Sequence, residues 1–134
     1  MTDRVKKRIL VVDDEAVIRM LLSDLLSEAG YIVDTIGDPI YAVREFDSPS
    51  KYDLIILDIN MPKMDGITLF RNITKGFPEV KNKFLFITRN LTEEALSFFK
   101  ENDCQYLTKP ADLLTQVNSI FNKEENGLAP EDAV

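Results

Sequence analysis

The stretch that decides the fold is Tyr52-Asp-Leu-Ile-Ile-Leu-Asp58-Ile-Asn-Met-Pro-Lys-Met-Asp-Gly66. Its apolar run, Leu54 to Leu57, is too short for a typical helix and is typical of a strand buried on both faces of a parallel sheet. Asp58 then places a carboxylate at the C-terminal end of that strand, and the proline and glycine that follow indicate a loop. Ligands of open α/β sheets bind at this edge. Taken alone, Asp58 fits a structural loop cap as well as a functional site.

The rest of the chain repeats a strand followed by a helix. Further strands are predicted over 9–12, 31–36, 84–87 and 104–108, and amphipathic helices over 17–29, 39–46, 67–76, 90–101 and 113–121. Gly30 is predicted as a helix C-cap, and Asp38-Pro39 as a helix start. Five alternations predict an α/β fold with a doubly wound, five-stranded parallel sheet and helices on both faces. In the flavodoxin-like order 2-1-3-4-5, strands one and three are neighbours.

Composition limits the possible functions. The 134 residues suggest one domain, and a net charge of -7 argues against direct nucleic-acid binding. The chain has no histidine, which removes histidine-based catalysis and metal ligation. The single cysteine, Cys104, rules out an internal disulfide and fits a reducing, cytoplasmic compartment, and no apolar run approaches transmembrane length. We expect one domain over residues 1–122, followed by an acidic, disordered tail over 123–134.

Acidic residues follow two of the predicted strands. Asp13 and Asp14 come directly after the first strand and Asp58 ends the third, so the predicted strand order brings them together. Two carboxylates about 4 Å apart repel by roughly 4 kcal/mol at an effective dielectric of 20, so we expect a cation among them. Oxygen ligands without histidine or cysteine favour Mg²⁺, with Mn²⁺ as the alternative ion. The competing interpretation is that the acids after the first strand cap the helix that follows.

Two more polar residues come at the same edge of the predicted sheet. Thr88 follows the fourth strand and Lys109 follows the fifth. A hydroxyl and an ammonium beside a metal-bound carboxylate indicate a site for a tetrahedral anion.

Taken together, these motifs resemble the receiver domain of bacterial two-component response regulators, over about residues 8–122. Each motif is weak alone, but their order at successive strand ends is specific. The matching segments are Val12-Asp-Asp-Glu15, Leu57-Asp58, Met61-Pro-Lys-Met-Asp-Gly66, Ile87-Thr88 and Tyr106-Leu-Thr-Lys-Pro110.

The resemblance implies a metal-dependent phosphoacceptor. Asp58 would accept a phosphoryl group from the phosphohistidine of a sensor histidine kinase or a histidine phosphotransfer protein. Asp14, Asp58 and the backbone carbonyl of Asn60 would bind Mg²⁺ directly, and Asp13 would act largely through bound water. Beyond catalysing its own phosphorylation and dephosphorylation, the chain would not be an enzyme.

The resemblance also implies a switch. Lys109 would pair with the phosphoryl oxygens, and its bond to Pro110 would be the family's cis-proline. Thr88 would move to hydrogen-bond the phosphoryl group, and Tyr106 would turn inward after it. The surface formed by the fourth helix, fifth strand and fifth helix would then change and bind a protein target that the sequence does not identify. The chain would be a monomer or a weak homodimer, without membrane contact.

Some residues depart from the family pattern. Arg89 stands where a small residue is usual, and either lies in solvent or shields the phosphoryl group and slows hydrolysis. Asn60 and Asn90 flank the pocket and are candidate modulators of the hydrolysis rate. Ala111 stands where an aromatic residue is common in the family, so the family's target-binding and dimerisation surface is less safely transferred to this chain.

Several alternatives stay open. The chain could act as a stand-alone regulator or as a relay intermediate that passes the phosphoryl group to another histidine. An aspartyl-nucleophile phosphohydrolase would need an acid where Asn60 stands. A phosphorylation-independent binding module would not need the full acid, threonine and lysine set. A flavodoxin-like cofactor carrier would need a glycine-rich phosphate loop after the first strand.

Overall fold

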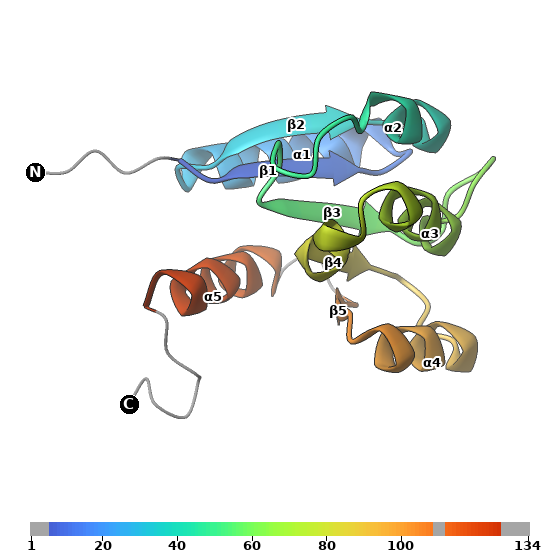
Figure 1. Ribbon diagram of the computed structural model, residues 1–134. Helices are drawn as coiled ribbons and strands as arrows, with labels where there is room; N and C mark the ends of the chain where they lie inside the picture. Colours follow the sequence, from blue (N-terminus) through green and yellow to red (C-terminus); the bar gives the residue numbers. More distant parts are fainter. Residues whose placement is uncertain (1–5, 109–111, 127–134) are drawn as a thin grey trace, which may run out of the picture.

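The protein is described by a computed structural model that covers residues 6–108 and 112–126. Its centre is a five-stranded parallel sheet in the order β2-β1-β3-β4-β5, as predicted (Figure 1). The strands are β1 (Arg8–Val12), β2 (Ile32–Ile36), β3 (Leu54–Asp58), β4 (Phe84–Ile87) and β5 (Gln105–Leu107).

Helices cover both faces of the sheet. Ile9 and Val11 of β1 belong to a core with α1 (Ala16–Glu28) and α5 (Leu113–Asn126). The alternate residues, Leu10 and Val12, belong to a second core with the remaining α-helices. Those are α2 (Pro39–Glu45), α3 (Gly66–Gly76) and α4 (Glu93–Asn102). Among the described helices, none is both long and apolar enough to cross a bilayer.

The central strand β3 fixes the position of Asp58. Leu54 to Leu57 are each at most 2% exposed. Burying a leucine or isoleucine side chain contributes about 1.5–3 kcal/mol, and a one-residue slip would exchange the two faces of the strand. Asp58 is therefore held at the C-terminal edge by the packing of the residues before it.

An aromatic cluster joins β4 to the helices on one face. Phe86 of β4 contacts Phe70 of α3 at 5.6 Å and Phe99 of α4 at 5.1 Å between ring centroids. Tyr106 of β5 stacks on Phe99 at 4.6 Å, with an interplanar angle of 13°. The side chain of Tyr106 thus continues this core toward the edge of the sheet.

Some element boundaries differ from the sequence predictions. The start of α4 lies at Glu93 rather than Asn90, because Thr92 is the N-cap and its hydroxyl accepts a hydrogen bond from the Ala95 N–H at 3.0 Å. A 3₁₀ helix, η1 (Pro78–Lys83), was not predicted. Helix α5 ends at Asn126, past the predicted domain boundary, whereas β5 is shorter than predicted. The capping roles of Gly30, which has φ +100°, and of Asp38 are confirmed.

Candidate functional site

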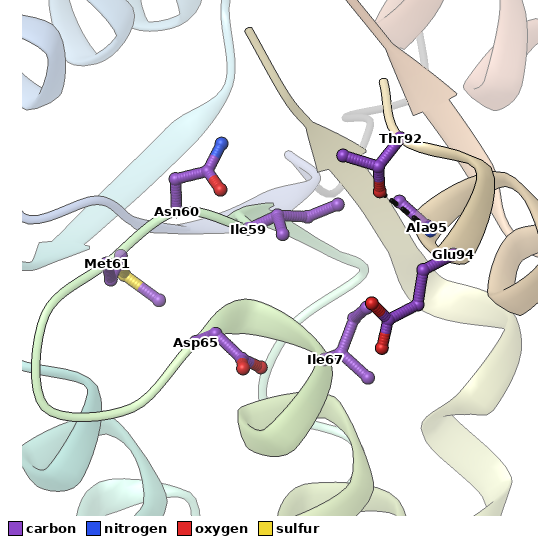
Figure 2. A pocket seen from close by; sticks show the side chains of 8 residues that line it. All are labelled: Ile59, Asn60, Met61, Asp65, Ile67, Thr92, Glu94 and Ala95. Carbon is purple, nitrogen blue, oxygen red and sulfur yellow. Dashed lines mark hydrogen bonds between the residues drawn. The ribbon is translucent and has the colours of Figure 1, made fainter. Parts of the chain in front are cut away.

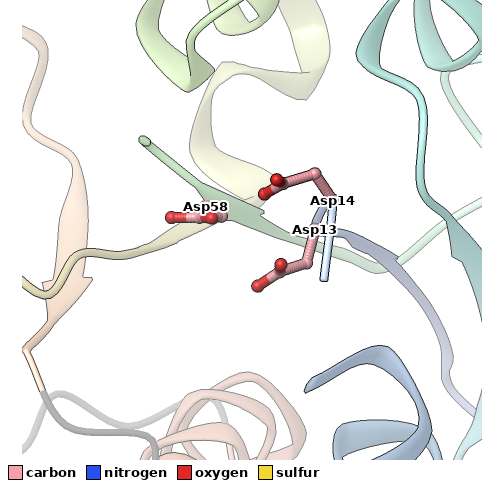
Figure 3. Close-up of side chains that lie close together, drawn as sticks. All are labelled: Asp13, Asp14 and Asp58. Carbon is pink, nitrogen blue, oxygen red and sulfur yellow. The ribbon is translucent and has the colours of Figure 1, made fainter. Parts of the chain in front are cut away.

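Three carboxylates meet at the C-terminal edge of the sheet. Val12 of β1 and Leu57 of β3 are register partners, so the residues that follow them, Asp13 and Asp58, lie side by side. One carboxylate oxygen from each of Asp13, Asp14 and Asp58 lies within 4.8 Å of the others (Figure 3). The predicted convergence of residues that are far apart in the sequence is confirmed.

Backbone hydrogen bonds hold the loops around these acids. Asp13 is buried, and its Oδ1 accepts a hydrogen bond from the Glu15 N–H at 2.8 Å. Arg19 of α1 donates from Nη1 to the Asp13 carbonyl oxygen at 2.7 Å. On the other strand, Asp58 Oδ1 accepts from the Asn60 N–H at 3.1 Å. Each loop is thus anchored on a carboxylate of the cluster.

The close packing of acids shifts their protonation. Burial raises the pKa of Asp58 to about 6, and repulsion from the Asp13 carboxylate adds to the increase. Burial also raises the pKa of Asp13, against the hydrogen bond from Glu15. Both shifts mean that burial and repulsion between the acids outweigh the attraction of the nearby Arg89 guanidinium.

The donor set fits Mg²⁺. All three groups are hard carboxylate oxygens, the ligand class that Mg²⁺ prefers. With bonds of ~2.1 Å, oxygens on opposite sides of the ion are about 4.2 Å apart, so oxygens within 4.8 Å need only small movements to share one ion.

Gly66 allows the loop after β3 to fold back on the strand. A Cβ atom at this position would lie 2.9 Å from the Cα of Ile59 and would collide with the Asp58 carbonyl oxygen. The Gly66 N–H donates to the Ile59 carbonyl at 2.9 Å. Glycine is therefore required by close contact beneath the acidic cluster.

Thr88 lies at the same edge, directly after β4. It is fully buried, and its N–H donates to the Leu107 carbonyl of β5 at 3.0 Å. Its hydroxyl donates to the Asn90 carbonyl at 2.9 Å and accepts from the Asn90 N–H at 3.2 Å. The Thr88 hydroxyl is thus occupied by its own loop, and Asn90 acts here through its backbone.

The other predicted switch residues are only partly visible. Tyr106 is half-buried against Phe99. Lys109, the predicted cis-proline Pro110 and Ala111 lie outside the described residues.

An ion pair between Glu15 and Arg89 was not predicted from the sequence. Arg89 Nη2 lies 2.9 Å from Glu15 Oε1 and 3.0 Å from Oε2. The sequence predicts that Arg89 either lies in solvent or shields the phosphoryl group, and neither prediction includes Glu15 as its partner. Glu15 is the N-cap residue of α1 but makes no side-chain capping bond, and Asp13 instead accepts the backbone N–H there. The only sequence signal was the placement of both residues shortly after strands that flank β3 in the sheet.

A pocket of about 450 Å³ adjoins the cluster on the side of α3 and α4. Figure 2 shows Ile67 of α3 and Glu94 of α4 close together at its wall, with Thr92 bonded to Ala95 above them. Asn60, from the loop that follows Asp58, lines the same pocket. The pocket therefore lies between the loop that follows Asp58 and the first turn of α4.

Comparison with known proteins decides the family. The family model described as the response regulator receiver domain matches residues 9–120. The chain belongs to this family. Receiver domains bind Mg²⁺ at an acidic pocket, interact with histidine kinases and phosphotransfer partners, and are mainly signalling modules.

Individual relatives agree with this assignment. The receiver is 38% identical over 114 residues to a protein-glutamate methylesterase/protein-glutamine glutaminase of Archaeoglobus fulgidus, covering 84% of the chain and 32% of that protein. The response regulator TrrA of Thermotoga maritima, solved in complex with Mg²⁺-BeF, has 35% identity and a TM-score of 0.69, covering 84% of this chain and 96% of TrrA.

The CheX-CheY-BeF3-Mg complex of Borrelia burgdorferi contains a similar chain with 30% identity and a TM-score of 0.74. The match covers 86% of this receiver and 89% of that chain. The receiver spans about a third of the length of the methylesterase, so the activity of that larger protein is not carried over.

Proposed function

We propose that this receiver accepts a phosphoryl group on Asp58 in a Mg²⁺-dependent reaction and thereby changes its interaction surface. The donor would be the phosphohistidine of a sensor histidine kinase or of a histidine phosphotransfer protein, in the cytoplasm. The single observation that carries the proposal is the convergence of Asp13, Asp14 and Asp58 at the edge where β1 and β3 are neighbours.

The transfer is a substitution at phosphorus. A carboxylate oxygen of Asp58 forms the new O–P bond while the N–P bond of the donor breaks, and the leaving imidazole nitrogen keeps the bonding pair and takes a proton from solvent. Bound Mg²⁺ would supply charge neutralisation for the phosphoryl oxygens. The partly exposed Asp58 carboxylate is open to a donor from the edge of the sheet.

The remaining residues hold the ion and the phosphoryl group. Asp14, Asp58 and the Asn60 carbonyl would bind Mg²⁺ directly, and Asp13, the more buried acid, would act largely through water. Mn²⁺, which also accepts oxygen ligands, would substitute. Lys109 would pair with the phosphoryl oxygens as the second cation of the site.

Thr88 would couple the modification to the surface. The acyl phosphate carries about two negative charges, and hydrogen bonds to charged groups contribute about 1.5–3 kcal/mol each. Two such bonds, from Thr88 and Lys109, approach the ≈ 5.5 kcal/mol that moves a two-state equilibrium from 1:99 to 99:1. Thr88 must leave Asn90 to make its bond, so the β4–α4 loop would move with it.

The movement would reach the surface through aromatic packing. Tyr106 would follow Thr88 inward, since the Thr88 N–H donates to the carbonyl of Leu107, the residue after Tyr106 in β5, and Tyr106 rests on Phe99 of α4. The faces of α4, β5 and α5, in a monomer or weak homodimer, would then present a different surface to a protein target.

Intact-mass measurement tests the proposal. The chain is incubated with acetyl phosphate with and without Mg²⁺, beside Asp58→Asn and the control Asp24→Asn, which makes the same chemical change on the exposed face of α1. We expect one phosphoryl adduct in the parent and in Asp24→Asn, only with Mg²⁺, and none in Asp58→Asn. An adduct that persists in Asp58→Asn would refute the site.

A further inference from the structure

The Glu15–Arg89 ion pair crosses the phosphoacceptor edge. Glu15 follows β1 and Arg89 follows β4, and these two strands flank β3 in the sheet. A contact between the two loops therefore passes over the end of β3, where Asp58 lies. The partners are 74 residues apart in the sequence, so the sheet order alone creates this bridge.

The bridge is built to be reversible. The side chains of Arg89 and Glu15 are 65% and 47% exposed, and exposed pairs of this kind are weak because water screens them. The guanidinium of Arg89 is near enough to lower the pKa of Asp58, although burial and the other acids outweigh it. Arg89 therefore already acts on the carboxyl group that would be modified.

We propose that Glu15 and Arg89 form a strap across Asp58 at rest, and that Arg89 leaves Glu15 for the phosphoryl oxygens when Asp58 is modified. This inference rests on the proposed phosphoacceptor function. Planar guanidinium groups bind phosphoryl oxygens with paired N–H donors, and an acyl phosphate offers more negative charge than one glutamate. Glu15 acts as a positioning residue, because it competes for Arg89 without touching the phosphoryl group.

The strap makes the two residues opposite in effect. Without the Glu15 carboxylate, the phosphoryl group has no competitor for the Arg89 guanidinium, so it should be bound more tightly. Without Arg89, the phosphoryl group loses this cationic partner, and removing Glu15 should have no further effect. The effect of removing Glu15 should therefore depend on the presence of Arg89.

Beryllofluoride with Mg²⁺ serves as the phosphoryl mimic, and its affinity is measured by ¹⁹F NMR for the full chain. The variants are Glu15→Gln, Arg89→Gln and the double variant. Lys63→Gln is the matched control for Arg89→Gln, because Lys63 forms a similarly exposed ion pair with Asp38 at 3.2 Å and each of the two substitutions removes one positive charge. The Nε–Hε signal of the Arg89 side chain, assigned by its absence in Arg89→Gln, reports directly on the partner exchange.

We expect Glu15→Gln to tighten beryllofluoride binding by about two- to fivefold and Arg89→Gln to weaken it by a similar factor, the range of an exposed ion pair. The double variant should match Arg89→Gln, Lys63→Gln should match the parent, and the Arg89 signal should shift on binding. A change of the same size for Glu15→Gln in both backgrounds, or an unmoved Arg89 signal in a beryllofluoride-bound chain, overturns the strap alone. Absence of beryllofluoride binding in the parent overturns the proposed function, and the strap with it.

Discussion

Asp58 is half-buried beside two other carboxylates, and this environment governs both its pKa and its contribution to stability. Its pKa in the folded chain, about 6, lies above the ordinary 3.8 because burial and the neighbouring acids disfavour the charged form. The folded chain therefore binds more protons than the unfolded chain between these pH values. Without metal, the free energy of unfolding should fall as the pH rises through this window, and stay lower above it.

Removing the charge of Asp58 should stabilise the metal-free chain at neutral pH. Because one pKa unit corresponds to about 1.4 kcal/mol, and solvent screening reduces the effect for a half-exposed group, we expect Asp58→Asn to stabilise the metal-free chain by about 1–2 kcal/mol at pH 7.5. The gain should largely vanish near pH 4. Urea unfolding at the two pH values measures it.

Asp24→Asn provides the comparison, since Asp24 is exposed on α1 away from the cluster. It should show no such gain. Saturating Mg²⁺ should stabilise the parent more than Asp58→Asn. Equal stability of the parent and Asp58→Asn at pH 7.5 would contradict the account of repulsion within the cluster.

At the scale of elements, the loops after β1, β3 and β4 build the site, and their shapes depend on close contacts. Gly66, the first residue of α3, is packed against the backbone of Asp58 and Ile59. The last residue of the same helix, Gly76, has open space where a Cβ would stand. One helix thus offers a constrained and an unconstrained glycine.

We predict that Gly66→Ala destabilises the chain by about 1–3 kcal/mol, because the added methyl group forces the backbone at Asp58 to move. It should also weaken Mg²⁺ binding, measured by calorimetry. Gly76→Ala should be neutral or stabilise by up to about 1 kcal/mol, because alanine has the higher helix propensity. If Gly66→Ala retained the Mg²⁺ affinity of the parent, as Gly76→Ala should, the close contact at Gly66 would not position the acceptor.

The strands and the edge that carries the site were predictable from the sequence, whereas some loop contacts were not. The strands were predictable because Leu54 to Leu57 and similar runs must be buried on both faces, and the residues that follow them share one edge. The start of α4 was predicted too early, because Thr92 caps the helix and the Asn90 backbone instead bonds the Thr88 hydroxyl in a local turn. The Glu15–Arg89 pair depends on the sheet order and on side-chain placement, which no local pattern encodes.

At the scale of the whole molecule, a sheet with a core on each face supports a set of loops at one edge (Figure 1). The β4–α4 loop joins the acidic cluster to the aromatic cluster around Phe86 and Phe99. Helix α2 contacts β2 and α3, whereas Tyr106 lies in β5 at the opposite edge of the sheet and stacks on Phe99 of α4. Activation should therefore be directional across the fold.

We predict that hydrogen exchange changes in residues 88–92 and 105–107 when Mg²⁺ and beryllofluoride are added, because Thr88 must leave Asn90. Residues of α2 (Pro39–Glu45) should keep their exchange rates. Asp58→Asn should remove the response under the same conditions. A change of equal size in α2 and around Thr88 would argue for general stabilisation rather than a switch.

The central claim is tested most directly by locating the phosphoryl group on the chain. After incubation with acetyl phosphate and Mg²⁺, borohydride reduction converts a phosphoaspartate to homoserine, and peptide mass spectrometry identifies its position. We predict a single modified position, Asp58, that is unmodified when Mg²⁺ is omitted. Modification of Asp13 or Asp14 in place of Asp58, or equal modification without Mg²⁺, would contradict the account.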